Sequence, residues 1–247
     1  MTTQTFQQTL ITTGSTFLAS GLGAVFYLLL ARKLGPAEYG LCSLAMAALL
    51  IVTSVGDLGL GQSLIRFVGA NRQDRQYLPY VNLALKTKLI SGTLAIIAFA
   101  GLSQQLAKYV FHQPSLSTLL PLVGIGVLAQ LLFFLSLAVF QGLQKFWLWG
   151  GFQVGVNTLR LIFLVPFIFI FRFSSFDGLA VFIFVYLLGF IISLIWLDRG
   201  LLKSKPSSSQ SSTFWAFNKW TAAMGIIMAI SSRIDILLTA RFLNLTQ

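Results

Sequence analysis

Residues 30–69 read LARKLGPAEYGLCSLAMAALLIVTSVGDLGLGQSLIRFVG, and this stretch decides how the chain folds. Gly35 is suited to end one helix and Pro36 to begin the next, so the stretch predicts a tight turn between two helices. The run 39–56 carries no charge. As a helix it is nearly long enough to cross a bilayer, which takes about 20 apolar residues.

The composition places the chain in a membrane. It has 247 residues, of which 56% are hydrophobic and only 9% are charged, whereas soluble domains carry about 25% charged residues. We therefore expect an all-α fold, a polytopic transmembrane helix bundle in contact with the lipid bilayer. Uncharged runs recur along the sequence, at 10–31, 39–56, 89–107, 115–144 and 179–197.

The apolar runs predict about seven helices, with a break near the end of the second. We expect the first six to form one lobe and the seventh to begin another. The predicted ranges are 10–31, 38–69, 84–107, 117–142, 148–171, 178–197 and 219–241.

The basic residues predict an orientation, because cytoplasmic loops of membrane proteins are enriched in lysine and arginine. More of them lie in the gaps after even-numbered helices than in the gaps after odd-numbered ones. The bias predicts a multi-pass protein of the inner (plasma) membrane with its amino terminus in the cytoplasm. The even gaps hold Arg66, Arg72, Arg75, Lys86, Lys88, Lys145, Arg199, Lys203, Lys205 and Lys219, and the odd gaps hold Arg32, Lys33, Lys108, Arg172 and Arg241.

A serine-rich segment, KSKPSSSQSST (203–213), separates the first six predicted helices from the seventh. Its composition predicts a flexible linker. We accordingly expect a transmembrane lobe over 1–200, a cytoplasmic linker over 201–215, and the first helix of a truncated second lobe over 216–247.

A short repeat supports that division. LLTARFL (237–243) matches LLLARKL (28–34) at five of seven positions. Chance similarity between apolar helices is one explanation. The other is a parallel repeat, which builds the two halves of many transporters. On that interpretation the chain is one half of a transporter plus the first helix of the next half.

LGPAEYG (34–40), DLGL (57–60) and the IRFV (65–68) that follows resemble the polysaccharide biosynthesis protein family, the Wzx-type flippases of the multidrug/oligosaccharidyl-lipid/polysaccharide exporter superfamily. RIDILLTARFL (233–243) is similar to the seventh helix of that family. The resemblance extends loosely over the whole chain. It implies two lobes, about 12 to 14 helices together, around a cavity for a polyprenyl-diphosphate-linked oligosaccharide. The partner of this chain would then be a missing C-terminal lobe or a second copy.

Three polar residues share one face of the fifth predicted helix. Gln153, Asn157 and Arg160 stand at i, i+4 and i+7, which aligns them. A charge inside a membrane helix is costly and marks a functional site by default. We interpret the three as substrate-binding residues for an anionic headgroup or a diphosphate. The alternative is a stripe that packs against a neighbouring helix, where Gly151 and Gly155 would allow a close approach.

The seventh predicted helix offers Arg233 and Asp235. Two residues apart on a helix, they do not face each other. We interpret Arg233 as a second substrate-binding cation, at a depth similar to that of Arg160, and Asp235 as a proton or sodium coupling site. Ion pairs with other helices, or an arginine that reaches out to the interface, are the structural alternatives.

Asp57 lies in the glycine-rich break SVGDLGLGQ (54–62) of the second predicted helix. Each glycine weakens a helix by about 1 kcal/mol relative to alanine. Aspartate is a preferred helix cap, so a cap and bend is the favoured interpretation of Asp57. The alternative is an ion-coupling residue at a hinge for alternating access.

Other functional classes fit the sequence less well. Its basic residues form no soluble face for nucleic acid. Its one histidine and one cysteine stand in no metal-ligand or catalytic spacing. We expect no enzyme activity, no cofactor and no metal, although a membrane enzyme of polysaccharide assembly is the weakest of the alternatives. A cation-coupled multidrug exporter of the same superfamily is the stronger one, since acidic cavities suit cationic cargo and cationic cavities suit anionic lipids.

Overall fold

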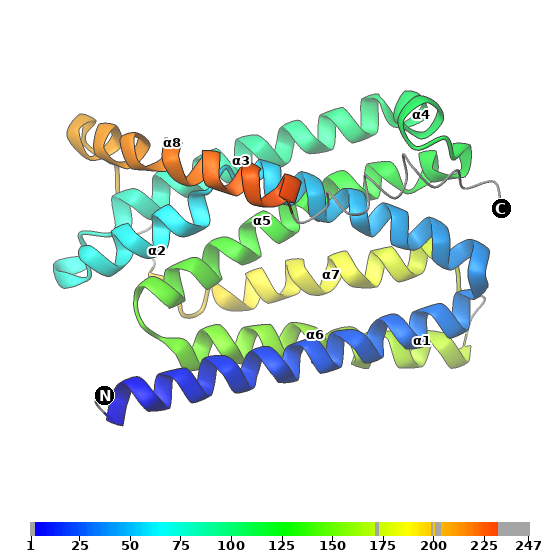
Figure 1. Ribbon diagram of the computed structural model, residues 1–247, viewed down its shortest axis with the longest axis horizontal. Helices are drawn as coiled ribbons and strands as arrows, with labels where there is room; N and C mark the ends of the chain where they lie inside the picture. The colour runs from blue at the N-terminus through cyan, green and yellow to red at the C-terminus, as the bar shows by residue number, and fades with distance from the viewer. Residues whose placement is uncertain (1–2, 171–172, 199, 201–203, 232–247) are drawn as a thin grey trace.

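A computed structural model describes residues 3–170, 173–198, 200 and 204–231, and the regular elements among them are all helices (Figure 1). The predicted all-α bundle of about seven helices is confirmed. The long helices are α1 (Thr3–Gly56), α2 (Leu60–Ala70), α3 (Leu78–Gly101), α5 (Leu120–Gly142), α6 (Phe146–Ile170), α7 (Ser175–Ser193) and α8 (Ser208–Ser231). Short helical turns between them are η1 (Gln73–Arg75), α4 (Ser103–Gln105), η2 (Leu106–Val110) and η3 (Pro114–Thr118).

Helix α1 consists of two helices that meet at Gly35. This glycine has φ 74° and ψ 173°, outside the helical region, and Pro36 follows it. The predicted turn is therefore confirmed. The apolar part of α1, Phe6–Gly56, is 51 residues long, enough for two crossings of a bilayer at about 20 residues each.

Five helices of the described chain, α1 among them, are long and apolar enough to cross a membrane. The others are α3, α5, α6 and α7, and the described part of α8 is not one of them.

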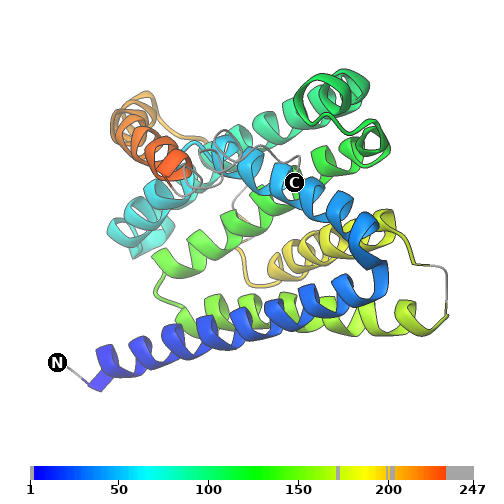
Figure 2. The same cartoon turned by 45° about the vertical axis from the view of Figure 1, so that its right-hand side comes forward.

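Helix α5 is the centre of the bundle. In its most apolar window, 78% of the residues are buried inside the protein, more than in any other candidate span. Helices α1, α2, α3 and α7 all pack against it. Figures 1 and 2 show the first half of α1 running alongside α6, with α3 and α8 on the opposite side of α5.

Glycines let α3 and α5 approach closely, as small residues do between membrane helices. A Cβ atom added at Gly124 of α5 would lie 2.8 Å from the Cα atom of Ile96. One added at Gly92 of α3 would lie 3.1 Å from the Cα atom of Leu128. The two helices thus meet backbone to backbone at both levels.

Helix α3 begins earlier than predicted, at Leu78 and not at residue 84. Pro79 occupies its first turn, where the missing N–H costs nothing. Leu78, Val81 and Leu85 are buried at helical spacing. Lys88 lies in the middle of this helix with its side chain fully buried, so the prediction that Lys88 lies in a cytoplasmic gap is wrong.

Helix α8 begins at Ser208, inside the segment predicted to be a flexible linker. A capping box explains this start: the N–H of Gln210 donates to Oγ of Ser207 at 3.2 Å, and the N–H of Ser207 donates to Oε1 of Gln210 at 3.0 Å. The predicted helix 219–241 continues past the described residues. The division of the chain into lobe, linker and further helix stays a prediction.

We expect Gly124→Ala to destabilise the bundle. The added methyl would push against the backbone of α3, and overpacking of this kind costs about 1–3 kcal/mol. Thermal unfolding in detergent, followed by tryptophan fluorescence, should show a lower midpoint. Gly101→Ala at the end of α3 is the control, because its Cβ would meet nothing within 4 Å. Equal midpoints for the two variants would contradict the close approach of α3 and α5.

Candidate functional site

The three polar residues predicted on one face of α6 do lie together. Nη1 of Arg160 donates to Oδ1 of Asn157 at 3.0 Å. Nδ2 of Asn157 in turn donates to the backbone carbonyl of Gln153 at 2.9 Å. These two hydrogen bonds link successive turns of α6. The same face also packs on α1, where a Cβ atom at Gly23 would lie 3.4 Å from Oδ1 of Asn157.

Arg160 is a buried cation held by aromatic rings. Only 4% of the residue is exposed. Its guanidinium carbon lies 4.1 Å from the ring centre of Phe182 and 4.5 Å from that of Tyr186, both on α7, and 5.9 Å from that of Phe26 on α1. Such cation–π contacts are worth about 2 kcal/mol when the cation is desolvated. Nothing in the sequence alone indicated that α7 would supply these rings.

Arg160 still has donors to spare. Its Nε and Nη2 atoms are buried and have no hydrogen-bond partner. The ion pairs among the described residues are Arg75–Asp198 and Lys88–Asp57, so no carboxylate described here neutralises Arg160. An unmet buried donor costs about 1–3 kcal/mol, and more when it is charged. Among the described residues, Arg160 is therefore a buried positive charge with two unused donors.

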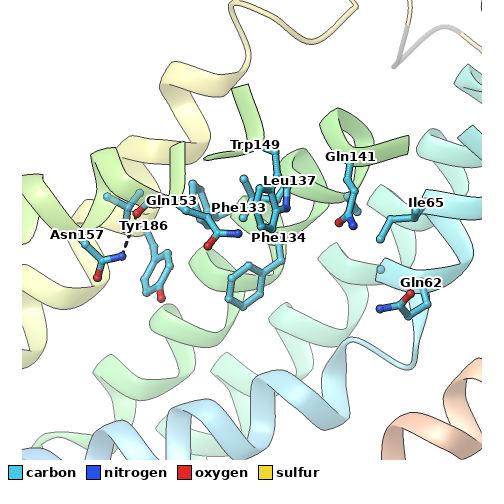
Figure 3. Close-up of a pocket in the computed structure, with 13 residues that line it drawn as sticks. Gln62, Ile65, Phe133, Phe134, Leu137, Gln141, Trp149, Gln153, Asn157 and Tyr186 are labelled. Atoms are coloured by element: carbon cyan, nitrogen blue, oxygen red, sulfur yellow. Dashed lines mark hydrogen bonds between the residues drawn. The ribbon is translucent and has the colours of Figure 1, made fainter. Parts of the chain in front are cut away.

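A cavity of about 330 Å³ opens next to this polar stripe, between α2, α5, α6 and α7 (Figure 3). Its lining combines carboxamides with aromatic rings, and none of the lining residues carries a formal charge. Figure 3 shows Trp149, Gln153 and Asn157 in succession along α6, with Gln62 and Ile65 across from them on α2. The lining residues are Gly61, Gln62, Ile65, Phe133, Phe134, Leu137, Ala138, Gln141, Trp149, Gln153, Val156, Asn157 and Tyr186.

A larger cavity of about 770 Å³ adjoins the first, between the end of α1, α2 and α8. The two share Gln62, Ile65 and Phe134 as lining residues. The larger one has two charged residues in its lining, Asp57 and Arg66. The guanidinium of Arg66 lies 4.1 Å from the ring centre of Phe217 on α8. The remaining lining residues are Thr53, Ser54, Gly59, Thr221, Met224 and Gly225.

Asp57 caps the helix that follows the break, α2, as predicted. Its Oδ2 accepts from the N–H of Gly61 at 3.1 Å, in the first turn of α2. Its other oxygen forms an ion pair with Nζ of Lys88 on α3. The Lys88 side chain is fully buried and that of Asp57 is 25% exposed. Sequence reasoning missed this pair, although two opposite charges at the ends of apolar runs gave a signal for it.

Arg233 and Asp235 lie outside the described residues, so their roles stay predictions. Gly151 and Gly155 were expected to allow a close helix approach. A Cβ atom at either would meet nothing within 4 Å, so in the described chain no helix uses this notch.

Known proteins resemble this chain in sequence and in fold. Over residues 5–246 the sequence matches the model of the family described as "Polysaccharide biosynthesis protein". No curated protein sequence matches it. One similar solved structure is described as the outward-facing conformation of a multidrug resistance MATE family transporter of the MOP superfamily. It has TM-score 0.73 and 13% identity, over 91% of this chain and 54% of that one.

A second similar structure is a MOP superfamily transporter from Pyrococcus furiosus. Its description states that the reverse polarity of its binding pocket suggests a different function. It has TM-score 0.72 and 13% identity, over 91% of this chain and 54% of that one. At this identity the likeness establishes the fold alone. The chain spans about half the length of these two transporters.

We expect Arg160→Met to fold at least as stably as the wild type. Replacing buried ionic groups by apolar side chains of similar volume is often neutral or stabilising, and here the change also removes two unmet donors. The measurement is the thermal unfolding midpoint in detergent without added lipid substrate. A fall comparable to that of a cavity-forming core variant such as Phe133→Ala would show that Arg160 serves the fold and not a ligand.

Proposed function

Because the chain belongs to the polysaccharide biosynthesis protein family, we propose that it forms part of a membrane transporter that moves a polyprenyl-diphosphate-linked oligosaccharide across the cytoplasmic membrane by alternating access. The described bundle supplies one wall of the transport path. A second bundle, from another lobe or a second copy of the chain, supplies the opposite wall. The amino terminus lies in the cytoplasm in this arrangement.

The observation that carries the proposal is the pairing of an uncharged polar cavity with a buried cation. The cavity holds four carboxamide side chains, those of Gln62, Gln141, Gln153 and Asn157. Arg160 lies one turn beyond Asn157 and is bonded to it. A neutral polar ligand portion and an adjacent anionic portion fit this pairing, and a diphosphate-linked glycan has both.

The cavity lining suits sugars for a physical reason. A carboxamide both donates and accepts, which matches the hydroxyl groups of a sugar ring. The flat rings of Trp149, Phe134 and Tyr186 offer apolar faces for the C–H faces of such a ring. Carboxylates would be expected in a cavity built for a cation, and this lining has none.

Arg160 suits the diphosphate. In the described conformation Arg160 is buried and lines neither cavity. We propose that its two unpartnered nitrogens bind the diphosphate, through the stronger charge-assisted kind of hydrogen bond, in a state of the transport cycle that exposes them. Arg233 and Asp235 follow the predicted linker in the sequence. We propose that Arg233 adds a second cation to the path and that Asp235 and Asp57 couple transport to protons or sodium ions.

A cation-coupled multidrug exporter is the second candidate, and one observation favours it. The surface of the larger cavity is mainly apolar, with Phe217 and Met224 among the residues that line it, and it contains the carboxylate of Asp57. That combination fits an amphipathic cation. Asp57 is already paired with Lys88, which weakens its attraction for a cationic cargo.

We expect Arg160→Met to slow flipping of a fluorescent polyprenyl-diphosphate-linked oligosaccharide in proteoliposomes by about 10- to 100-fold, because one or two charge-assisted hydrogen bonds of about 1.5–3 kcal/mol are lost. The rate is read from protection of the fluorophore against a membrane-impermeant reductant. Lys108→Met is the matched control, since this exposed cation lies against Tyr109, away from both cavities.

Three outcomes separate the candidates. Loss of flipping in Arg160→Met alone supports the lipid-linked substrate. Equal flipping by Arg160→Met and the wild type overturns it. Export of a cationic dye that survives Arg160→Met and is lost in the double variant Asp57→Asn with Lys88→Met, which leaves no unpaired buried charge, identifies the exporter instead.

A further inference from the structure

We propose that the Asp57 carboxylate is a cation-exchange site at which the ammonium of Lys88 competes with a small monovalent cation, either a proton or a sodium ion. Exchange loosens the break between α1 and α2 and changes how α8 sits on it. The place of this exchange in a transport cycle rests on the proposed function; the exchange itself does not.

The burial of Lys88 makes its pairing obligatory. Its side chain is fully buried in the middle of α3, and Asp57 is its partner among the described residues. Removing one member of a buried pair costs about 3–5 kcal/mol, because the other charge is left uncompensated. If an external cation neutralises Asp57, Lys88 must therefore move or lose its proton. Exchange at Asp57 thus forces a structural response.

An external cation has access to Asp57 but not to Lys88. Asp57 is 25% exposed and lines the cavity of about 770 Å³. Thr53 lies one turn before it on the same face and lines the same cavity. Its hydroxyl oxygen is buried without a hydrogen-bond partner. A carboxylate and a free hydroxyl beside an interrupted helix offer oxygen ligands of the kind that bind coupling ions in transporters.

Few charged groups of the part of the chain that the structure describes surround the site. Arg66 on α2 is the other charged residue that lines the cavity with Asp57. Helix α5 faces the break with Leu131, whose side chain would lie 3.5 Å from a Cβ atom at Gly56, and α8 faces it with uncharged residues. Competition at Asp57 is therefore between Lys88 and the incoming cation, with Arg66 opposing both.

The break itself is strained and held by its neighbours. Leu58 has φ 48°, in the left-handed region that costs a residue other than glycine about 1–3 kcal/mol. Its carbonyl oxygen accepts from Nδ2 of Asn218 on α8 at 3.0 Å. Oγ of Ser63 on α2 donates to Oδ1 of Asn218 at 2.8 Å.

Helix α8 rests directly on the break. A Cβ atom at Gly59 would lie 2.5 Å from the backbone carbon of Thr221. Asp57 holds α2 through Gly61 and α3 through Lys88, while Asn218 holds the same break from α8. A change of partner at Asp57 therefore reaches α8 through residues that are already bonded to it.

The test measures the distance between α3 and α8 in the full chain in liposomes. Spin labels are attached at Ile90→Cys and Trp220→Cys, both exposed positions, after the buried Cys42 is replaced by alanine. Pulsed electron resonance then records the distance distribution in sodium or choline, each at mildly acidic and mildly alkaline pH. We expect the distribution to shift with sodium, with acid, or with both.

Lys88→Met gives the decisive comparison. Without its competitor, Asp57 should respond at a cation concentration lower by about 5- to 150-fold, the range of ordinary site-to-site coupling. The double variant Asp57→Asn with Lys88→Met leaves no unpaired charge, so it should fold and should show no response. Arg75→Met is the matched control, because it removes the cation of the exposed pair with Asp198 and should respond as the wild type does.

The outcomes distinguish a proton from a sodium ion and test whether the exchange site exists. A shift with acid alone identifies the proton as the competitor, and a shift with sodium at constant pH identifies the sodium ion. An unchanged distribution under all conditions, or the same midpoint in Lys88→Met and the wild type, overturns the exchange site. A shift without flipping of the lipid substrate would keep the exchange site and reject the proposed function, and flipping without a shift would do the reverse.

Discussion

The structure depends on how positive charge is buried among apolar helices. Two cations of the described chain lie inside the bundle, Lys88 on α3 and Arg160 on α6, and both are almost inaccessible to solvent. Charge in such a place costs several kcal/mol unless it is compensated. Lys88 is compensated fully by the carboxylate of Asp57. Arg160 has ring faces and one amide oxygen around it. Lys88 therefore has a counter-ion, and Arg160 has none among the described residues.

Close packing at glycines brings the helices around both buried cations together. A Cβ atom at Gly126 would lie 2.4 Å from the side chain of Leu49 on α1 and 2.8 Å from that of Ile183 on α7. Near the break, a Cβ atom at Gly56 would lie 3.8 Å from Cβ of Ser91 on α3. These contacts bring the end of α1 against α3, and Lys88 lies one turn before Ser91. The ion pair is therefore a product of glycine-mediated packing and not of any local motif.

Local chemistry explains what could be predicted from the sequence. Gly35 and Pro36 predict the turn, and the glycines at 56, 59 and 61 predict the break, because each of these residues acts on the backbone of its own neighbours. Helical spacing is equally local, so it placed Gln153, Asn157 and Arg160 on one face. The helix ends at α3 and α8 were misplaced where apolar spacing and a capping box extend the helix into polar sequence.

Contacts between helices were the part that could not be predicted. The spacing of Phe182 and Tyr186 on α7 shows that they share a face, but only the packing of α6 on α7 tells that Arg160 lies against it. Lysine near a predicted helix end is usually a topology signal. For Lys88 that rule failed, because the partner that makes its burial tolerable comes from a helix earlier in the chain.

The two cavities share one turn of helix α2. Gly61, whose N–H is held by Asp57, lines the smaller cavity, and Gln62 beside it lines both. A rotation of the first turn of α2 therefore moves the amide lining and the acidic break together. Coupling between distant sites needs an element with two arrangements that both sites bias. The first turn of α2 is short, follows a break strained at Leu58, and lines both cavities directly, so it is the element of the described chain best placed for that role.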